Sequence, residues 1–251
     1  MRNIGCCHCT TGEKMIDDYI VKSLKVLNKV QYELDEYSKT ETSLIYPQKN
    51  EPKKSKPLKR ISEQEAKILL CHILLQEHVV FSLETPTVEK YSFTGNKKIS
   101  GNLDLCIYEI RNVKYYRSNC IEYKAHNMSK TYKNDFQKLL REQGDNYFIH
   151  ILQSADNYTL CSAREKNSKG KPVINKYLSD INDILKTKTD LDFNTITLYI
   201  CVLSPFLIIK KKIYKSELTI SMNEKDFFLD YCIKENSIII NNQNWELVKN
   251  T

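Results

Sequence analysis

The sequence predicts an α/β fold in which helices flank a central mixed β-sheet. Segments with apolar residues at helical spacing alternate with short runs rich in β-branched and aromatic residues, which are typical of strands. The expected order is a helix, three strands, a helix, a strand, a helix and further strands. Such an order favours one α/β domain whose sheet contains both parallel and antiparallel strands.

The composition is that of a globular protein with a basic surface. Of 251 residues, 41% are hydrophobic and 27% are charged, and the formal net charge is +7. This excess is compatible with a polyanionic partner such as nucleic acid, and equally with an ordinary solvated surface. Nine cysteines, an odd number without framework spacing, indicate a reduced, cytoplasmic protein. The longest apolar run, 195–209, is too short to span a bilayer, so no membrane segment is expected.

Three regions are expected along the chain. Residues 1–60 contain an amphipathic helix within 11–36 and an exposed basic segment, Pro47 to Arg60. Residues 61–205 form the core, which begins with a helix after Ser62. Glu65 three positions later completes a capping-box pattern, and Ile68, Leu69, Ile73 and Leu75 are expected to bury that helix. Residues 206–251 add C-terminal strands and a short helix from Asp226 to Ile233.

The remaining core elements follow from the same patterns. Strands are expected in VVFSLETPTVEKYSF, GNLDLCIY, SNCIEYKA and YFIHIL, and later in NTITLYICVL, FLIIKKKIY and SIIINN. Helices are expected in SKTYKNDFQKLLREQGDN, which Gly144 closes, and in INKYLSDINDILKT.

Two of these apolar runs carry charged residues. Asp104 lies in GNLDLCIY, and Glu122 and Lys124 lie in CIEYKA. Side chains alternate along a strand, so Glu122 and Lys124 share a face, and Asp104 meets Glu122 if the strands are neighbours. Two carboxylates and a phosphate are a typical Mg²⁺ site, beside which a lysine can position water or stabilise negative charge. The pattern is either a phosphodiester-hydrolysing cluster or ordinary alternation with its polar side in water.

This arrangement resembles the PD-(D/E)xK nuclease superfamily, which has the restriction-endonuclease-like fold. The core of that family is a helix, a three-stranded meander bearing the Asp and the E-x-K, a crossover helix and a fourth strand. The resemblance covers about residues 61–153, or up to 203 if a fifth strand is included, and Leu103 stands where the motif has proline. It implies a Mg²⁺-dependent deoxyribonuclease, with Mn²⁺ as a substitute, in which Asp104 and Glu122 bind metal and Lys124 is catalytic. A 5′-phosphate product, a role in bacterial or phage restriction and defence, and a homodimer when both strands are cut are further implications.

The resemblance also implies a helix glutamate in the metal site, with Glu65 as the choice and Glu63 as the alternate. Further residues are expected to contact substrate. They are Arg117, His126, Lys130, Lys133 and Gln143. Gln143 begins a Q-x-x-x-Y pattern seen in an exonuclease branch of the family, but Gly144 also permits a helix C-cap there.

Other functions remain open on the sequence. A zinc site is one interpretation of the adjacent residues Cys6, Cys7, His8 and Cys9. No second ligand pair follows in the sequence, so the alternative is that these thiols are incidental. A nucleic-acid-binding or assembly module that keeps the fold without cleavage is a second hypothesis. A ribonuclease on the same scaffold is a third.

Overall fold

The computed structural model describes most of the predicted core. The described residues are 11–33, 48–49, 58–59, 62–91, 99–126, 131–161, 172–187, 191–218, 222–234, 237–241 and 244–248. Within the basic segment 47–60, the two-residue strands β1 (Gln48–Lys49) and β2 (Leu58–Lys59) pair antiparallel. The Cys6–Cys9 segment and Lys130 lie outside the described residues.

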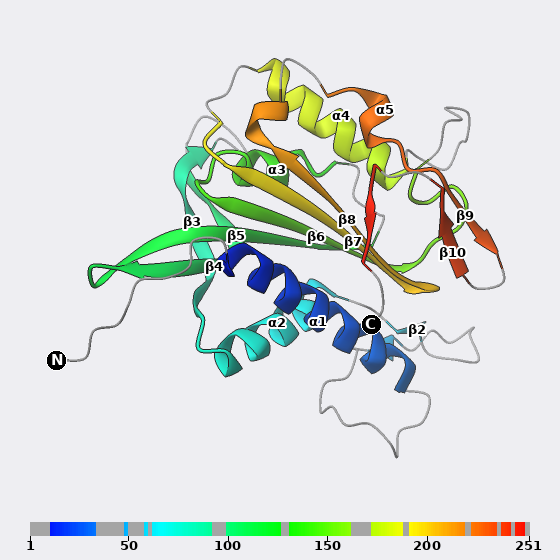
Figure 1. Cartoon of the computed structure of the whole chain (residues 1–251), viewed down its shortest axis with the longest axis horizontal. Coiled ribbons are helices and arrows are strands. Elements are labelled where there is room, and N and C mark those ends of the chain that lie inside the picture. Colours follow the sequence, from blue (N-terminus) through cyan, green and yellow to red (C-terminus); the bar gives the residue numbers. More distant parts are fainter. Residues whose placement is uncertain are drawn as a thin grey trace.

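A seven-stranded mixed sheet forms the centre of the molecule, as predicted (Figure 1). Its strand order is β11-β8-β7-β6-β5-β4-β3. The strands β3 to β5 form an antiparallel meander, β5, β6 and β7 are parallel, and β8 and β11 are antiparallel additions. The strands are β3 (Val80–Tyr91), β4 (Ile99–Arg111), β5 (Lys114–Ala125), β6 (Asp145–Ser154), β7 (Thr195–Ser204), β8 (Phe206–Tyr214) and β11 (Glu246–Leu247). Of the strands after residue 205, β8 and β11 therefore extend the same sheet.

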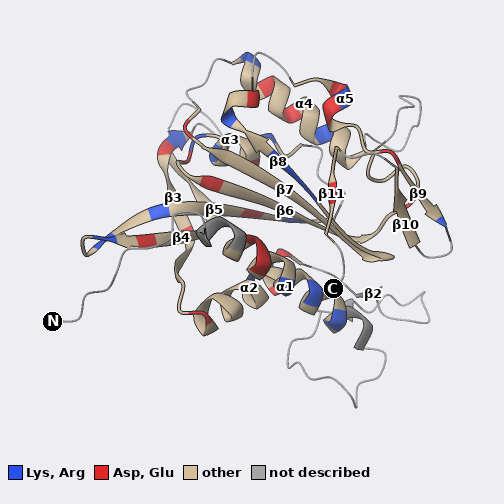
Figure 2. Ribbon diagram, viewed as in Figure 1, with Lys and Arg blue, Asp and Glu red and all other residues tan. Residues whose placement is uncertain are grey.

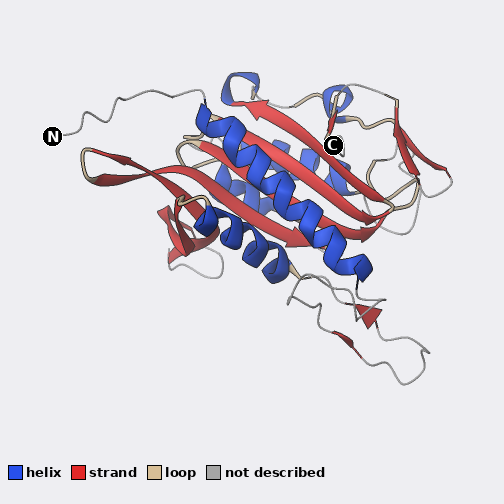
Figure 3. Cartoon of the chain, turned by 60° about the horizontal axis from the view of Figure 1, so that its bottom comes forward, coloured by secondary structure: helices blue, strands red, loops and turns tan. Residues whose placement is uncertain are grey.

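Helices cover both faces of this sheet. Figure 3 shows α1 (Thr11–Glu33) and α2 (Glu63–Gln76) side by side across one face. On the other face lie α3 (Lys133–Leu139), α4 (Val173–Lys186) and the short α5 (Glu224–Phe227), which follows a 3₁₀ turn at Lys215–Glu217 (Figure 1). No helix in the described part of the chain is long and apolar enough to cross a membrane.

Alternation along the strands creates two hydrophobic cores. On β6, Tyr147 and Ile149 pack into the core beneath α1 and α2, whereas Phe148 and Leu152 pack into the core beneath α3 and α4. The strands β6 and β7 are buried on both faces, which is the environment expected of central parallel strands.

The two N-terminal helices bury one stripe each. Apolar residues of α1 at helical spacing are fully buried, as predicted; they are Ile16, Ile20, Leu24, Leu27 and Val30. The prediction for α2 is partly wrong, because Ile68 and Leu75 are exposed. The stripe that faces the core runs instead through Ala66, Leu70 and Leu74, since residues four apart lie on one side of a helix.

The predicted helix from Asp226 to Ile233 is wrong. The α5 helix ends at Phe227, and the chain continues into β9 (Tyr231–Lys234), which pairs antiparallel with β10 (Ser237–Ile240). Phe227, Leu229 and Tyr231 are all buried, and this two-residue period requires an extended chain. The Tyr231 hydroxyl also donates to the carbonyl of Asp156, which holds the strand against the loop after β6.

The β4–β5 hairpin extends beyond the other strands as an arm (Figure 1). Several large side chains of its end are exposed, among them Val113, which is 92% exposed. The base of the arm lies under α3. That helix begins where Asp180 of α4 accepts the backbone N–H of Tyr132, with an Oδ2···N distance of 2.6 Å. The end of β5 contacts the first turns of α2 and α3, so the three elements meet at one end of the sheet.

Candidate active site

Asp104 lies on β4 at the point where the pairing between β4 and β5 ends. The last paired residues there are Leu105 and Ile121. Beyond them, Oδ2 of Asp104 accepts a hydrogen bond from the backbone N–H of Tyr123 at 2.7 Å. The other oxygen, Oδ1, lies 2.9 Å from Nζ of Lys67 on α2. The carboxylate thus replaces a strand partner and is held between the sheet and α2.

Glu122 lies on the neighbouring strand β5 and is only 2% exposed. Its Oε1 atom lies 2.5 Å from Nζ of Lys138 on α3. Burial raises the pKa of the Glu122 carboxyl above its usual range; the Lys138 ammonium acts in the opposite direction, and the charges of Asp104 and Asp135 raise the pKa further. Glu122 is therefore close enough to both of these carboxylates to be repelled by them.

Lys124 follows Glu122 by two residues and reaches the same helix. Its Nζ atom lies 3.3 Å from Oδ2 of Asp135, in the first turn of α3. Burial lowers the pKa of Lys124, but the negative charges of Asp135 and Glu63 outweigh that effect and the net shift is upward. The lysine therefore stays charged at neutral pH, beside Asp135 of α3 and Glu63 of α2.

The glutamate that α2 contributes to this region is Glu63, the alternate in the prediction. Its Oε1 accepts the backbone N–H of Ala125 at 3.2 Å, and burial raises its pKa while Lys124 lowers it. The predicted choice, Glu65, accepts both the backbone N–H of Ser62, at 3.1 Å, and the Ser62 hydroxyl. Glu65 therefore caps the helix, as its capping-box spacing indicates, and Glu63 faces the end of β5.

The structure adds three residues that sequence reasoning did not select: Lys67, Asp135 and Lys138. Lys67 bridges Asp104 to Glu84, whose Oε1 lies 2.7 Å from Nζ. A signal for them existed in the sequence. Lys67 lies four residues after Glu63, and Lys138 lies three after Asp135, which places a carboxylate and a lysine on one side of each flanking helix. We define the carboxylate–lysine cluster by its residues Glu63, Asp104, Glu122, Asp135, Lys67, Lys124 and Lys138.

The carboxylate oxygens of the cluster are ligands of the kind that a hard divalent cation takes. The described residues contain no group of three or more His, Cys, Asp or Glu side chains that could hold a metal ion. Mg²⁺, however, is commonly held by one or two carboxylates, with waters and substrate phosphates completing its shell. Asp104 and Glu122 lie on neighbouring strands just beyond the last β4–β5 pair, and Asp104 accepts the backbone N–H of Tyr123, the residue after Glu122; a cation between the two carboxylates would relieve their repulsion. Asp104 and Glu122 therefore fit as the residues that would hold such an ion.

Two other predicted contact residues lie at the margin of the cluster. His126 directly follows β5 and has a left-handed backbone, with φ of 69°. Its carbonyl lies 2.8 Å from Nε2 of His150, a buried histidine on β6. Lys133 is the first residue of α3, and its backbone N–H donates to Thr131. These contacts fix the chain on both sides of the segment between β5 and α3.

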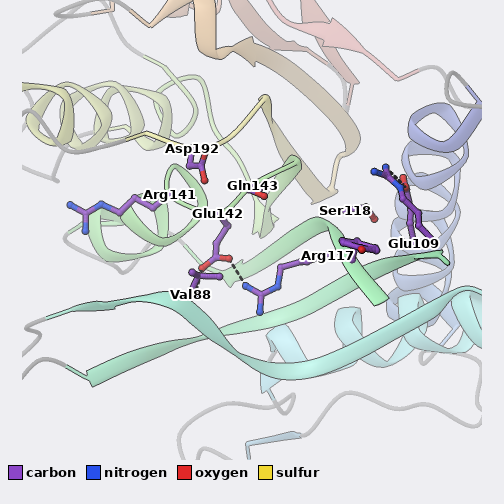
Figure 4. A pocket seen from close by; sticks show the side chains of 10 residues that line it. Val88, Glu109, Arg117, Ser118, Arg141, Glu142, Gln143 and Asp192 are labelled. Carbon is purple, nitrogen blue, oxygen red and sulfur yellow. Dashed lines mark hydrogen bonds and ion pairs between the residues drawn. The ribbon is translucent and has the colours of Figure 1, made fainter. Parts of the chain in front are cut away.

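Arg117 and Gln143 lie elsewhere, at a cavity of about 330 Å³ near the C-terminal end of α3 (Figure 4). Arg117 forms an ion pair with the buried Glu142, whose other oxygen accepts the backbone N–H of Val88 at 2.8 Å. Gln143 lies beyond the end of α3, and Gly144 has φ of 100°, so a turn rather than a helix presents the glutamine. The structure therefore places Arg117 and Gln143 together at this cavity, which no residue of the carboxylate–lysine cluster lines.

Comparison with known proteins identifies no relative of the chain: no family model matches it, and neither the curated proteins nor the solved structures give a match.

Proposed function

We propose that this chain is a metal-dependent nuclease that hydrolyses phosphodiester bonds, with DNA as its expected substrate. The observation that carries the proposal is the fork between β4 and β5. There Asp104 and Glu122 lie on neighbouring strands, and Lys124 lies two residues beyond Glu122. Each of the three makes an ionic contact with a helix that flanks the sheet.

The order of the elements supports the same proposal. The helix α2, the meander β3-β4-β5, the crossover helix α3 and the parallel strand β6 follow one another as in the restriction-endonuclease-like core. The carboxylates fall on the second and third strands of the meander, where that fold carries its motif. The agreement extends to Glu63, because that fold often takes a further glutamate from the preceding helix.

The chain's own residues have separable roles in the proposed reaction. A divalent cation held by Asp104 and Glu122 would polarise the phosphoryl group and lower the pKa of an attacking water. Lys124 has a raised pKa, so it acts as a charge rather than as a base, orienting the water and stabilising the negative charge that develops on phosphate. Asp135 holds the Lys124 ammonium in place.

Basic residues supply affinity for a polyanion. The net charge of +7 favours a nucleic-acid backbone, whose phosphates provide most sequence-independent binding. Figure 2 shows lysines and arginines along several strands. The exposed Tyr115 and Tyr116 near the end of the arm suit stacking on unpaired bases.

A nucleic-acid-binding module without cleavage is the second candidate, and one observation favours it. Asp104 and Glu122 are each already paired with a lysine, Lys67 and Lys138 respectively. A site whose carboxylates are neutralised by the protein itself binds a cation less readily. Binding and cleavage must therefore be measured separately.

The deciding experiment is cleavage of labelled single-stranded DNA, double-stranded DNA, plasmid and RNA with Mg²⁺, Mn²⁺ or a chelator. We expect metal-dependent cleavage of DNA, with loss of at least about 100-fold in rate for Lys124→Met and Asp104→Asn. Lys186→Met is the matched control, because Lys186 is an exposed lysine on α4 and is expected to leave the rate unchanged.

The outcomes separate the candidates. Equal inertness of wild type and both variants on every substrate contradicts a nuclease, and tight binding in the same samples then supports the module. Cleavage that persists unchanged in both variants assigns the activity to a contaminant or another site. Cleavage of RNA alone retains the cluster and changes the substrate.

A further inference from the structure

We propose that Lys138 is an internal counter-ion that occupies the Glu122 side of the metal site, and that a divalent cation must displace its ammonium in order to bind. In this role Lys138 is a positioning residue that sets the metal affinity of the site. The inference rests on the proposed function, because it takes Asp104 and Glu122 as the residues that hold the ion.

The surroundings of the Lys138 ammonium resemble those of a bound cation. Nζ lies 2.5 Å from Oε1 of Glu122 and 2.8 Å from the backbone carbonyl of Asn102. Oδ1 of Asp135 lies 3.7 Å away as a third oxygen. Carboxylate and carbonyl oxygens are also the atoms that Mg²⁺ and Mn²⁺ take as ligands. The ammonium therefore uses donors that a divalent ion would use.

The position of this ammonium is set by the fold. Phe136 and Leu139, on either side of Lys138 along α3, are fully buried in the core beneath the helix. The Lys138 side chain is 11% exposed, so it lies between helix and sheet rather than in open solvent. A helix anchored in this way keeps the lysine over β5, and only the flexible stem of the side chain can move the ammonium.

The structure also offers a second position for the ammonium. Asp135, three residues earlier on α3, contacts Lys138 and also holds Lys124. Residues three apart on a helix are surface neighbours, so Lys138 can turn from Glu122 toward Asp135 without a change in the backbone. Displacement by a cation would then leave both the lysine and the glutamate with a partner.

Asp104 has an equivalent arrangement on the opposite side of the fork. Lys67 of α2 pairs with Asp104 at 2.9 Å and with Glu84 at 2.7 Å. Each of the two carboxylates thus has a lysine from its own flanking helix. The pairing keeps neighbouring negative charges together at the fork, at the cost of a weaker attraction for an external cation.

The test compares Mn²⁺ binding to wild type and Lys138→Met by isothermal titration calorimetry and by the electron paramagnetic resonance signal of free Mn²⁺. Methionine keeps the length and packing of the stem and removes the charge. We expect Lys138→Met to bind Mn²⁺ about tenfold more tightly than wild type. We also expect a lower melting temperature without metal that recovers when Mn²⁺ is added.

Two variants make the comparison decisive. Lys186→Met removes the same type of lysine from a pair with Asp183, also three residues apart but exposed, and is expected to leave Mn²⁺ affinity unchanged. Lys138→Arg keeps the charge and adds a fork of donors that holds a carboxylate more firmly, so it is expected to weaken Mn²⁺ binding. If Lys138→Met does not fold, the Mn²⁺ affinity of Lys138→Arg relative to wild type tests the role of Lys138.

Failure of this inference can be told from failure of the proposed function. Three results overturn the role of Lys138, even if wild type cleaves DNA. They are Mn²⁺ affinity that is unchanged or weaker in Lys138→Met, affinity that is unchanged or tighter in Lys138→Arg, and affinity that is undetectable in every variant. Tighter binding in Lys138→Met supports that role, even if no substrate is cleaved, and in that case only the nuclease proposal fails.

Discussion

His150 provides a prediction for the pH dependence of stability. It lies on β6 beside Lys124, is fully buried, and both ring nitrogens have partners. The backbone carbonyl of His126 can only accept, so Nε2 carries the proton and Nδ1 accepts from the Tyr177 hydroxyl, 2.5 Å away. The neutral ring is thus fully hydrogen-bonded, and an added proton would face a hydroxyl that already donates to it.

The size of the effect follows from the pKa of this histidine. Burial lowers it from 6.5 to about 4; the bond to His126 opposes that shift, and the nearby charges of Lys176 and Lys124 reinforce it. Between these two pH values the unfolded chain binds a proton that the folded chain does not. Stability from this group is therefore complete above pH 6.5 and falls as the pH is lowered. The slope is about 1.4 kcal/mol per pH unit, which amounts to about 3 kcal/mol by pH 4.

Urea unfolding of wild type and His150→Gln between pH 7.5 and 4.5 tests this prediction. Raised carboxyl pKa values, such as that of Glu122, contribute the opposite slope, so the difference between the two proteins is the quantity to measure. The gap in unfolding free energy should shrink by about 1.4 kcal/mol per pH unit below 6.5. His72→Gln, which changes an exposed histidine on α2, should run parallel to wild type. A gap between wild type and His150→Gln that stays constant with pH would refute the reasoning.

Two further predictions concern the turn after α3 and the start of α2. Gly144→Ala should lower the unfolding free energy, measured by urea denaturation, by about 2 to 3 kcal/mol. The reason is that φ of Gly144 is 100° and a Cβ atom there would collide with the carbonyl of Ser118. A variant as stable as wild type would contradict this backbone conformation. Glu65→Ala should cost about 1 kcal/mol of stability through the lost cap and leave the cleavage rate per folded molecule unchanged. Glu63→Gln should instead lower that rate about tenfold with little change in melting temperature, and the reverse pattern would exchange their roles.

Local patterns in the sequence determined most of the elements. The apolar spacing of α1, the capping box at Ser62 and the β-branched and aromatic runs of β3 to β8 each involve neighbours a few residues apart, so the sequence alone predicts them. Asp104, Glu122 and Lys124 could be chosen for the same reason, because strand alternation fixes which side chains share a face. The helix predicted from Asp226 to Ile233 is wrong because the two-residue spacing of buried Phe227, Leu229 and Tyr231 outweighs helical propensity in that segment.

Only the tertiary structure decided which helix side chains meet the strand carboxylates. The Lys67–Asp104 pair joins residues 37 apart, and the Glu63–Ala125 bond joins residues 62 apart. No local period specifies contacts at such separations. They depend on how α2 and α3 seat their apolar stripes on opposite faces of the sheet, and that packing turns Glu63 rather than Glu65 toward the end of β5. The strands thus fix the carboxylates, whereas the packing of the helices supplies the lysines that balance their charge.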